Sequence, residues 1–254
     1  MKSRLLFLLL LFIAGFSQAQ NRMTDKNNIG WFAANATFNV SERFGIHTEY
    51  QWRRDNYVEN WQQGLLRVGV NYKLTPDVLF RVGYAWAETY PYGDIPLNGF
   101  GKDFTEHRIF EMAQLSQKVS ALSISHRFML EQRWVGRYPN PIFTSEDDYA
   151  YLNRLRYMVR LQLPVYQKLY VAAYDELFIG FGKNIGENIF DQNRFGALVG
   201  YPISANFKLE GGYLNQIVQL GRELGGQNVF QHNNGFIVSG IFTFDLNKPE
   251  NPAN

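Results

Sequence analysis

The chain alternates apolar and polar residues with a period of two in one segment after another. Residues 121–134 show the pattern: one set of alternate positions is mostly apolar and ends in Trp134, and the other set carries Arg127, Glu131 and Arg133. Successive side chains of a strand point to opposite faces, so each such segment has one apolar and one polar face. The pattern predicts eleven strands, at residues 29–39, 43–53, 62–73, 78–88, 104–116, 121–134, 149–163, 168–180, 190–201, 206–217 and 233–246.

Two of these runs leave the orientation of the strand open. In residues 104–116, neither phase separates Glu111 from Ile109. In residues 168–180, the adjacent Asp175 and Glu176 put one carboxylate on the apolar face unless a bulge intervenes. Both phases stay undecided from the sequence.

Short turns alternate with longer links between the predicted strands. The short turns are NVSER, LTPD, SQKVS, PVYQK and PISAN, and the longer links are residues 54–60, 89–103, 135–148, 182–188 and 218–231. This alternation around strands of about ten residues is typical of an outer-membrane barrel. We therefore predict an all-β, antiparallel, up-and-down transmembrane β-barrel of ten to twelve strands. Bacterial single-chain barrels have even strand numbers, so eleven runs favour twelve strands, with ten as the alternative.

Two features favour lipid over a soluble core. The apolar face recurs on nearly every strand while the opposite face is charged, and aromatic rings near the strand ends suit the headgroup layer of a membrane. A sheet in hydrocarbon must close on itself, because each unpaired backbone group there costs several kcal/mol. A secreted soluble β-protein remains the alternative. The predicted interface aromatics are Tyr50, Trp52, Tyr72, Trp86, Trp134, Tyr151 and Tyr201.

The N-terminus predicts export. Residues 1–19 combine Lys2 and Arg4 with an apolar run and small residues before a cleavage site after Ala19, which is the pattern of a secretory signal peptide. We expect a short N-terminal segment at residues 20–27, a barrel at 28–247 and a polar tail at 248–254. The expected location is the outer membrane of a diderm (Gram-negative) bacterium.

Composition narrows the chemistry. The 254 residues carry a net charge of +2 and no cysteine, which excludes disulfides and thiolate sites and gives no sign of nucleic-acid binding. The sequence has no Gly-rich phosphate loop, no His-Glu-x-x-His motif and no Ca²⁺ loop. We therefore expect no cofactor and no metal.

Six segments, in order, resemble the uncharacterised outer-membrane family catalogued as domain of unknown function 2490. They are EHRIFEMAQL, HRFMLEQRW, NRLRYMVRLQLP, AAYDELFIGFG, FDQNR and GYLNQ. The resemblance covers nearly all of the mature chain and implies a barrel in the outer membrane but no known activity. Phe242 and Phe244 resemble the C-terminal aromatic signature read by the barrel assembly machinery, although the tail beyond Phe244 departs from it. Outer-membrane lipid and that machinery are the expected partners of a monomer.

The polar faces of the strands predict a charged lumen. We expect these side chains to pair with each other in a structural or passive barrel. The excess of arginine leaves a narrow anion-favouring pore as an alternative. The predicted lumen charge network is Arg53, Arg67, Arg81, Arg127, Arg133, Arg154, Arg156, Arg160, Arg194, Glu49, Glu131, Glu176 and Glu210.

A membrane-embedded lipid or envelope hydrolase is the remaining alternative. The chain lacks the His-Gly-x-x-Asn-x-Ser motif of outer-membrane lipolytic barrels. Ser125 and His126 are strand neighbours that point to opposite faces, and the same holds for Asp175 and Glu176. We therefore predict no catalytic residue and no enzyme.

Overall fold

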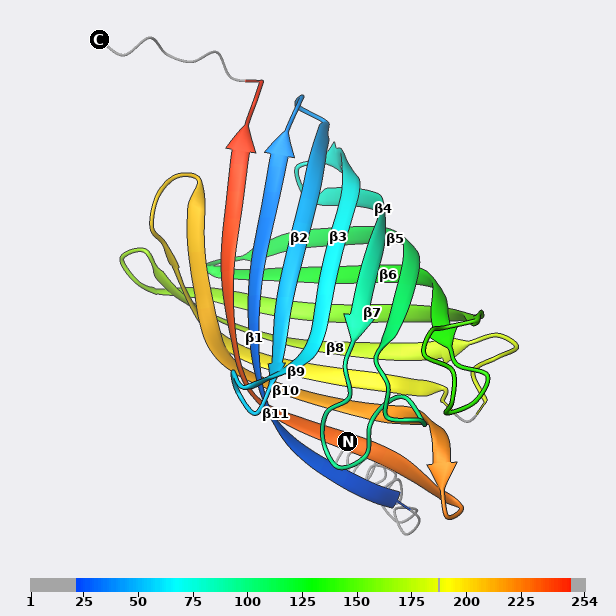
Figure 1. The fold of residues 1–254 in the computed structure, drawn as a ribbon. Coiled ribbons are helices and arrows are strands. Elements are labelled where there is room, and N and C mark those ends of the chain that lie inside the picture. The colour runs from blue at the N-terminus through cyan, green and yellow to red at the C-terminus, as the bar shows by residue number, and fades with distance from the viewer. Residues whose placement is uncertain (1–21, 187, 248–254) are drawn as a thin grey trace, which may run out of the picture.

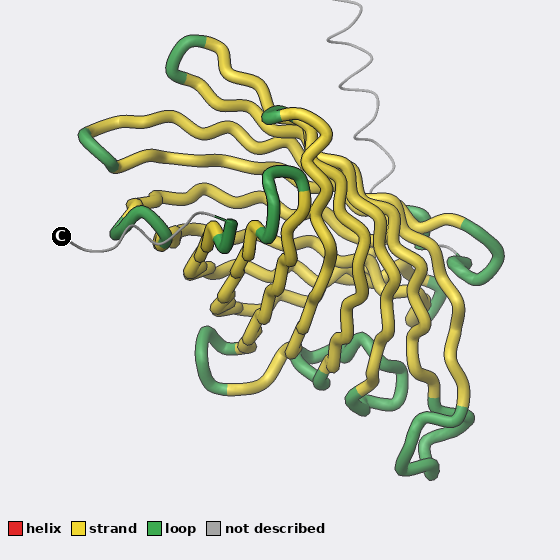
Figure 2. Tube along the Cα trace, turned by 90° about the horizontal axis from the view of Figure 1, so that it is seen from above, coloured by secondary structure: helices red, strands yellow, loops and turns green. Residues whose placement is uncertain are grey.

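The computed structural model describes residues 22–186 and 188–247. The predicted signal peptide and the predicted polar tail lie outside the described residues. The described part consists of strands and connecting loops, without a helix (Figure 2). The strands are β1 (Arg22–Asn39), β2 (Phe44–Asp55), β3 (Asn60–Thr75), β4 (Val78–Thr89), β5 (Phe104–Val119), β6 (Leu122–Arg137), β7 (Asp148–Tyr166), β8 (Leu169–Phe181), β9 (Phe190–Pro202), β10 (Phe207–Leu224) and β11 (Gln227–Asp245).

These eleven strands form one closed barrel, which confirms the predicted β-barrel fold. The preference for an even number, twelve or ten, is wrong, because a parallel pair of β1 and β11 closes the wall with an odd number of strands. Consecutive strands pair antiparallel, and β1 closes the wall against β11 in parallel, from Arg22 opposite Asn228 to Asn39 opposite Asp245. The odd strand number requires the parallel pair, because strands of alternating direction make the first and the last run the same way. In Figure 1 the arrows of β1 and β11 run side by side, and the strands β1–β4 cross the strands β6–β9 at a steep angle. Such tilt is what closure of a sheet demands.

The connections divide the barrel into two ends. Residues 40–43, 76–77, 120–121, 167–168 and 203–206 make the turn end, and residues 56–59, 90–103, 138–147, 182–186, 188–189 and 225–226 make the loop end. One predicted longer link and the predicted N-terminal segment are largely strand instead. The link at 218–231 contracts to Gly225 and Gly226, whose φ values of 58° and 75° suit a tight hairpin turn. β1 likewise starts at Arg22, so residues 22–27 belong to the wall and not to a separate segment.

The two faces of the wall have opposite character. Val70 is 50% exposed on the outer face, whereas its neighbour Asn71 is 2% exposed inside. The same inversion holds along the strands β2 to β10, where apolar side chains are exposed and charged ones such as Glu131 and Arg154 are buried. A water-soluble protein has the opposite arrangement. The exposed apolar band therefore faces lipid, as in a transmembrane barrel.

The inside of the barrel also holds small apolar clusters. Ile29, Trp31 and Leu214 form one cluster. Phe110, Met112 and Met129 form another, which lies against Leu79. These clusters fill part of the lumen between the charged groups.

The structure fixes the two strand phases that the sequence left open. Glu106 and Arg108 are buried inside, so Glu111 lies on the outer face, where Gln132 Nε2 donates a hydrogen bond to its Oε2 at 3.2 Å. The register of β8 is regular at Asp175, which places this carboxylate outside. Asn193 Nδ2 donates to both Asp175 oxygens, at 3.0 and 3.1 Å.

The predicted interface aromatics all occupy outward positions. Tyr50, Trp52, Tyr151 and Tyr201 are exposed on the outer face. Tyr72, Trp86 and Trp134 are half-buried among neighbouring side chains. Their place at the membrane boundary stays a prediction. No helix within residues 22–186 and 188–247 is long and apolar enough to cross a membrane.

Candidate functional site: the charged lumen

Alternation along the strands brings ten arginines and seven carboxylates to the inner face of the barrel. The strand pairing places each predicted arginine and glutamate of the network there. Arg108, Glu106, Asp191 and Asp25 are additional members. Glu106 and Arg108 were missed because the phase of residues 104–116 was undecided, and Asp25 and Asp191 lie at or beyond the ends of predicted strands. The set is Arg53, Arg67, Arg81, Arg108, Arg127, Arg133, Arg154, Arg156, Arg160, Arg194, Asp25, Glu49, Glu106, Glu131, Glu176, Asp191 and Glu210.

Most of these groups join into one ion-pair chain that crosses strands β5 to β9. Arg156 bridges two carboxylates of this chain: its Nη1 lies 2.8 Å from Glu131 Oε1 and its Nη2 lies 2.7 Å from Glu176 Oε1. On one side Arg127 Nη2 lies 2.8 Å from the same Glu176 oxygen. On the other side Arg154 Nη2 lies 2.6 Å from Glu131 Oε2.

The chain continues from Arg154 to the wall at β5. Arg154 Nη1 lies 2.7 Å from Asp191 Oδ2, and Arg133 Nη1 lies 3.5 Å from Asp191 Oδ1. Arg133 also pairs with Glu106, which Arg108 Nη2 meets at 2.7 Å. We refer to Arg127, Glu176, Arg156, Glu131, Arg154, Asp191, Arg133, Glu106 and Arg108 as the ion-pair chain.

Two smaller groups lie outside the ion-pair chain. Arg67 Nη1 is 2.6 Å from Glu49 Oε2, and His47 Nε2 is 3.7 Å from the same oxygen. Arg160 pairs with Glu210, which also accepts a hydrogen bond from the Tyr170 hydroxyl at 2.7 Å. Every buried carboxylate of β2 to β10 therefore has an arginine beside it within the described residues.

Three of the ten lumen arginines form no ion pair with a carboxylate of the described residues. Arg81 Nε donates to Asn71 Oδ1 at 2.6 Å. Arg53 donates to the amide oxygens of Gln51 and Gln63. Arg194 Nη2 donates to Gln192 Oε1 at 3.3 Å. These hydrogen bonds are all with neutral acceptors, so Arg53, Arg81 and Arg194 have no carboxylate in direct contact among the described residues.

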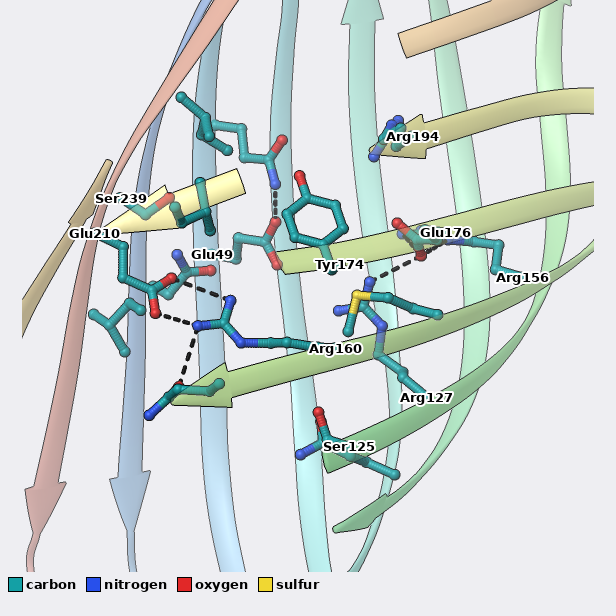
Figure 3. Close-up of a pocket in the computed structure, with 18 of the residues that line it drawn as sticks. Glu49, Ser125, Arg127, Arg156, Arg160, Tyr174, Glu176, Arg194, Glu210 and Ser239 are labelled. Atoms are coloured by element: carbon teal, nitrogen blue, oxygen red, sulfur yellow. Dashed lines mark hydrogen bonds and ion pairs between the residues drawn. The ribbon is translucent and has the colours of Figure 1, made fainter. Parts of the chain in front are cut away.

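Two cavities lie in the lumen formed by the described strands. The larger has a volume of about 520 Å³ and reaches toward the turn end, where Ser123, Ser125 and Ser239 line it (Figure 3). The smaller has a volume of about 210 Å³ and lies toward the loop end, beneath Tyr92 and Leu97. Arg53 and Arg194 line both cavities. These two arginines therefore mark the junction between the halves of the lumen.

The loop of residues 90–103 folds across the mouth at the loop end. It connects β4 to β5 but is tied to strands β10, β11 and β1. Arg222 donates to the carbonyl oxygens of Pro96 and Leu97 at 2.6 and 2.7 Å. Gln231 Nε2 donates to the Ile95 carbonyl at 2.8 Å. The loop thus narrows the opening above the smaller cavity.

Tyr92 anchors this loop inside the barrel. Its hydroxyl accepts a hydrogen bond from Asn233 Nδ2 at 3.2 Å, and its ring is buried. Burial raises the pKa of Tyr92 to about 12, because the phenolate would lose its hydration there.

The histidines are distributed over both faces of the wall. His107 Nδ1 lies 2.6 Å from the Tyr84 hydroxyl, and His126 Nδ1 lies 2.8 Å from the Tyr157 hydroxyl, both on the outside. Ser125 lines the lumen, so it lies on the opposite face from His126. In the part of the chain that the structure describes, no group of three or more His, Cys, Asp or Glu residues could hold a metal ion.

The fold and the lumen define a transmembrane β-barrel with a charged, ion-paired interior. The family model described as "Protein of unknown function (DUF2490)" matches residues 28–223, and the chain belongs to this family. Among solved structures, the NanC porin in its rhombohedral crystal form is similar, with 13% sequence identity and a TM-score of 0.46 over 81% of this chain and 93% of that chain. The comparison with curated proteins finds no significant match.

Proposed function

We propose that this protein is a passive barrel of the outer membrane whose arginine-rich lumen is held together by the ion-pair chain. The observation that supports the proposal is the continuity of the chain from Arg127 to Arg108. Each carboxylate in it touches two arginines, and three of its five arginines touch two carboxylates. Removing one member of such a pair leaves a buried charge uncompensated, at a cost of about 3–5 kcal/mol. The chain therefore ties the strands β5 to β9 together across the lumen.

A narrow anion-favouring passage is the second candidate. It is favoured by the excess of arginine over carboxylate in the lumen and by the position of Arg53 and Arg194 against both cavities. Fixed positive charge in a narrow channel attracts anions and repels cations. The loop of residues 90–103 and the ion-pair chain restrict such a passage to small ions.

The exposed apolar band and the C-terminal aromatics also suggest where the protein is located and how it is assembled. We infer insertion into the outer membrane of a diderm bacterium as a monomer, after delivery by the barrel assembly machinery. The exposed apolar band supports a lipid surrounding, and Phe242 and Phe244 close the last strand at the turn end.

Planar-bilayer recordings separate the two candidates. The purified full-length protein is reconstituted with a gradient of potassium chloride across the membrane, and the conductance and the reversal potential are measured. The passive barrel predicts no ion-conducting steps. The second candidate predicts small conductance steps whose reversal potential lies close to the equilibrium potential of chloride. Cation-selective steps would contradict both candidates, because the lumen arginines would then not set the field.

A further inference from the structure

We propose that Arg194 and Arg53 form a binding site for an oxyanion beside Trp31, at the junction of the two cavities. The chemical class of the ligand is a small solute with a carboxylate or phosphate group. This inference goes beyond the proposed function, because such a site can be occupied whether or not the barrel conducts ions.

The first argument is the state of Arg194. Arg194 is 9% exposed, and its Nε is buried without a hydrogen-bond acceptor among the described residues. The only acceptor found for its guanidinium there is Gln192 Oε1, at 3.3 Å from Nη2. Buried donors are normally paired, and leaving one unpaired is costly, more so on a charged group. An oxyanion that accepts from Arg194 would remove this cost. Arg194 lines the larger cavity (Figure 3). Glu176 is opposite it in the register of β8 and β9, but this carboxylate is paired with Arg127 and Arg156.

The second argument is that Arg53 adds a second uncompensated charge at the same place. Its Nε lies 2.8 Å from Gln51 Oε1, and its Nη1 lies 2.6 Å from Gln63 Oε1. Gln51 in turn donates its amide N–H to Glu49, which fixes the amide oxygen toward Arg53. Arg53 is therefore held in position by neutral groups that do not cancel its charge.

Aromatic rings hold both guanidinium groups in place. The Arg53 guanidinium carbon lies 3.9 Å from the Trp31 ring centroid, and that of Arg194 lies 4.9 Å from it. Arg194 also lies 4.7 Å from the Phe178 ring centroid. Contacts of this type stabilise a cation without neutralising it. A site whose donors are already fixed binds its ligand with a smaller loss of entropy.

The carboxylates of the larger cavity cannot readily replace a ligand. Glu49 is engaged by Arg67, and Glu210 by Arg160. Glu176 accepts from both Arg127 and Arg156. The guanidinium fork matches the geometry of carboxylate and phosphate oxygens, which accept two parallel hydrogen bonds. The positive charge and the free donors therefore point to an oxyanion as the ligand.

Thermal unfolding in detergent tests the site. The full-length protein is titrated with sodium phosphate and, separately, with sodium acetate, against sodium chloride at the same ionic strength. A ligand that binds the folded state raises the unfolding midpoint in a saturable way. We expect this response in the wild type and an apparent Kd at least tenfold weaker in R194Q and in R53Q. R194K, which keeps the charge but loses the fork, should fall between the wild type and R194Q.

The matched control is R54Q. Arg54 is the next residue along β2, carries the same charge and lies on the outer face over Trp52 and Trp61. We expect R54Q to keep the wild-type affinity for the anion even where its midpoint without anion changes. A response to phosphate alone supports a phosphate ligand, and a response to both anions supports any oxyanion.

The site is refuted if the wild type shows no saturable response to either anion, or if R194Q and R53Q both respond like the wild type. Should R194Q fail to fold, R53Q and R194K carry the test. Bilayer selectivity is measured independently of this titration. Anion-selective steps without saturable binding would refute the binding site and support the anion-favouring passage. Saturable binding without conductance would support the binding site and refute the passage.

Discussion

Substituting Arg156 with leucine removes an arginine that bridges two carboxylates of the ion-pair chain. The change breaks the contacts with Glu131 and Glu176, at 2.8 and 2.7 Å, and leaves both carboxylates buried. Breaking a buried pair from one side costs about 3–5 kcal/mol. Glu131 keeps Arg154 and Glu176 keeps Arg127, so we expect the lower end of that range, about 3 kcal/mol. This loss corresponds to a fall of roughly 6–12 °C in the unfolding midpoint of a chain of this size.

The folded fraction is measured by the altered gel migration of unheated barrel, as a function of incubation temperature in detergent. Arg137→Leu is the control, because Arg137 is exposed at the loop end of β6 and surface substitutions change stability by about 0.5 kcal/mol or less. Arg156→Lys should lie between the two, since lysine keeps the charge but lacks the planar fork that meets two carboxylates. A midpoint for Arg156→Leu equal to or above that of Arg137→Leu would refute the ion-pair reasoning.

Three further predictions concern other parts of the barrel. A Cβ on Gly235 would lie 1.7 Å from the Ile29 carbonyl oxygen at the β1–β11 pair. Gly235→Ala should therefore sharply reduce the yield of folded barrel on the same gels. Gly211→Ala should not, because a Cβ there would lie 3.5 Å from its nearest atom. The raised pKa of Tyr92 means that the folded state holds this proton more tightly than the unfolded state, so its contribution to stability is present below about pH 10 and is lost as the pH rises toward 12. Tyr92→Phe should accordingly lose less stability than the wild type between pH 9 and pH 12 in unfolding measurements. Purified protein should release no fatty acid from phospholipid vesicles, and a release that disappears on replacing His107 or His47 would instead establish the hydrolase.

The strands of the barrel wall could be predicted from the sequence because the alternation of apolar and polar residues is a local property. Arg67 and Val68 are neighbours with opposite environments, and their order along the chain already states which side each occupies. The same rule failed at residues 104–116 because Glu111 occupies an outward position, where an apolar residue is expected. Gln132 on the next strand offers that carboxylate a hydrogen bond, which a single-strand pattern cannot reveal.

The ion pairs and loop contacts within the lumen could not be predicted from the sequence, for a different reason. Which arginine meets Glu131 depends on the register of β6 against β7, where Glu131 is opposite Arg154, and on the tilt of the closed wall. Periodicity gives the face of a side chain but not its neighbour across the barrel. The inward fold of the loop at residues 90–103 likewise depends on hydrogen bonds from Arg222 and Gln231, more than 120 residues away along the chain.

The parallel pairing of β1 with β11 decides on which side of a membrane each end of the barrel sequence emerges. The polypeptide enters the wall through Arg22 at the loop end and leaves it beyond Asp245 at the turn end. A barrel with an even strand number would bring both points to one rim. Since the chain has no cysteine, single cysteines introduced at Arg22 and at Leu246 would report this polarity, and an impermeant thiol reagent added from one compartment should label only one of them.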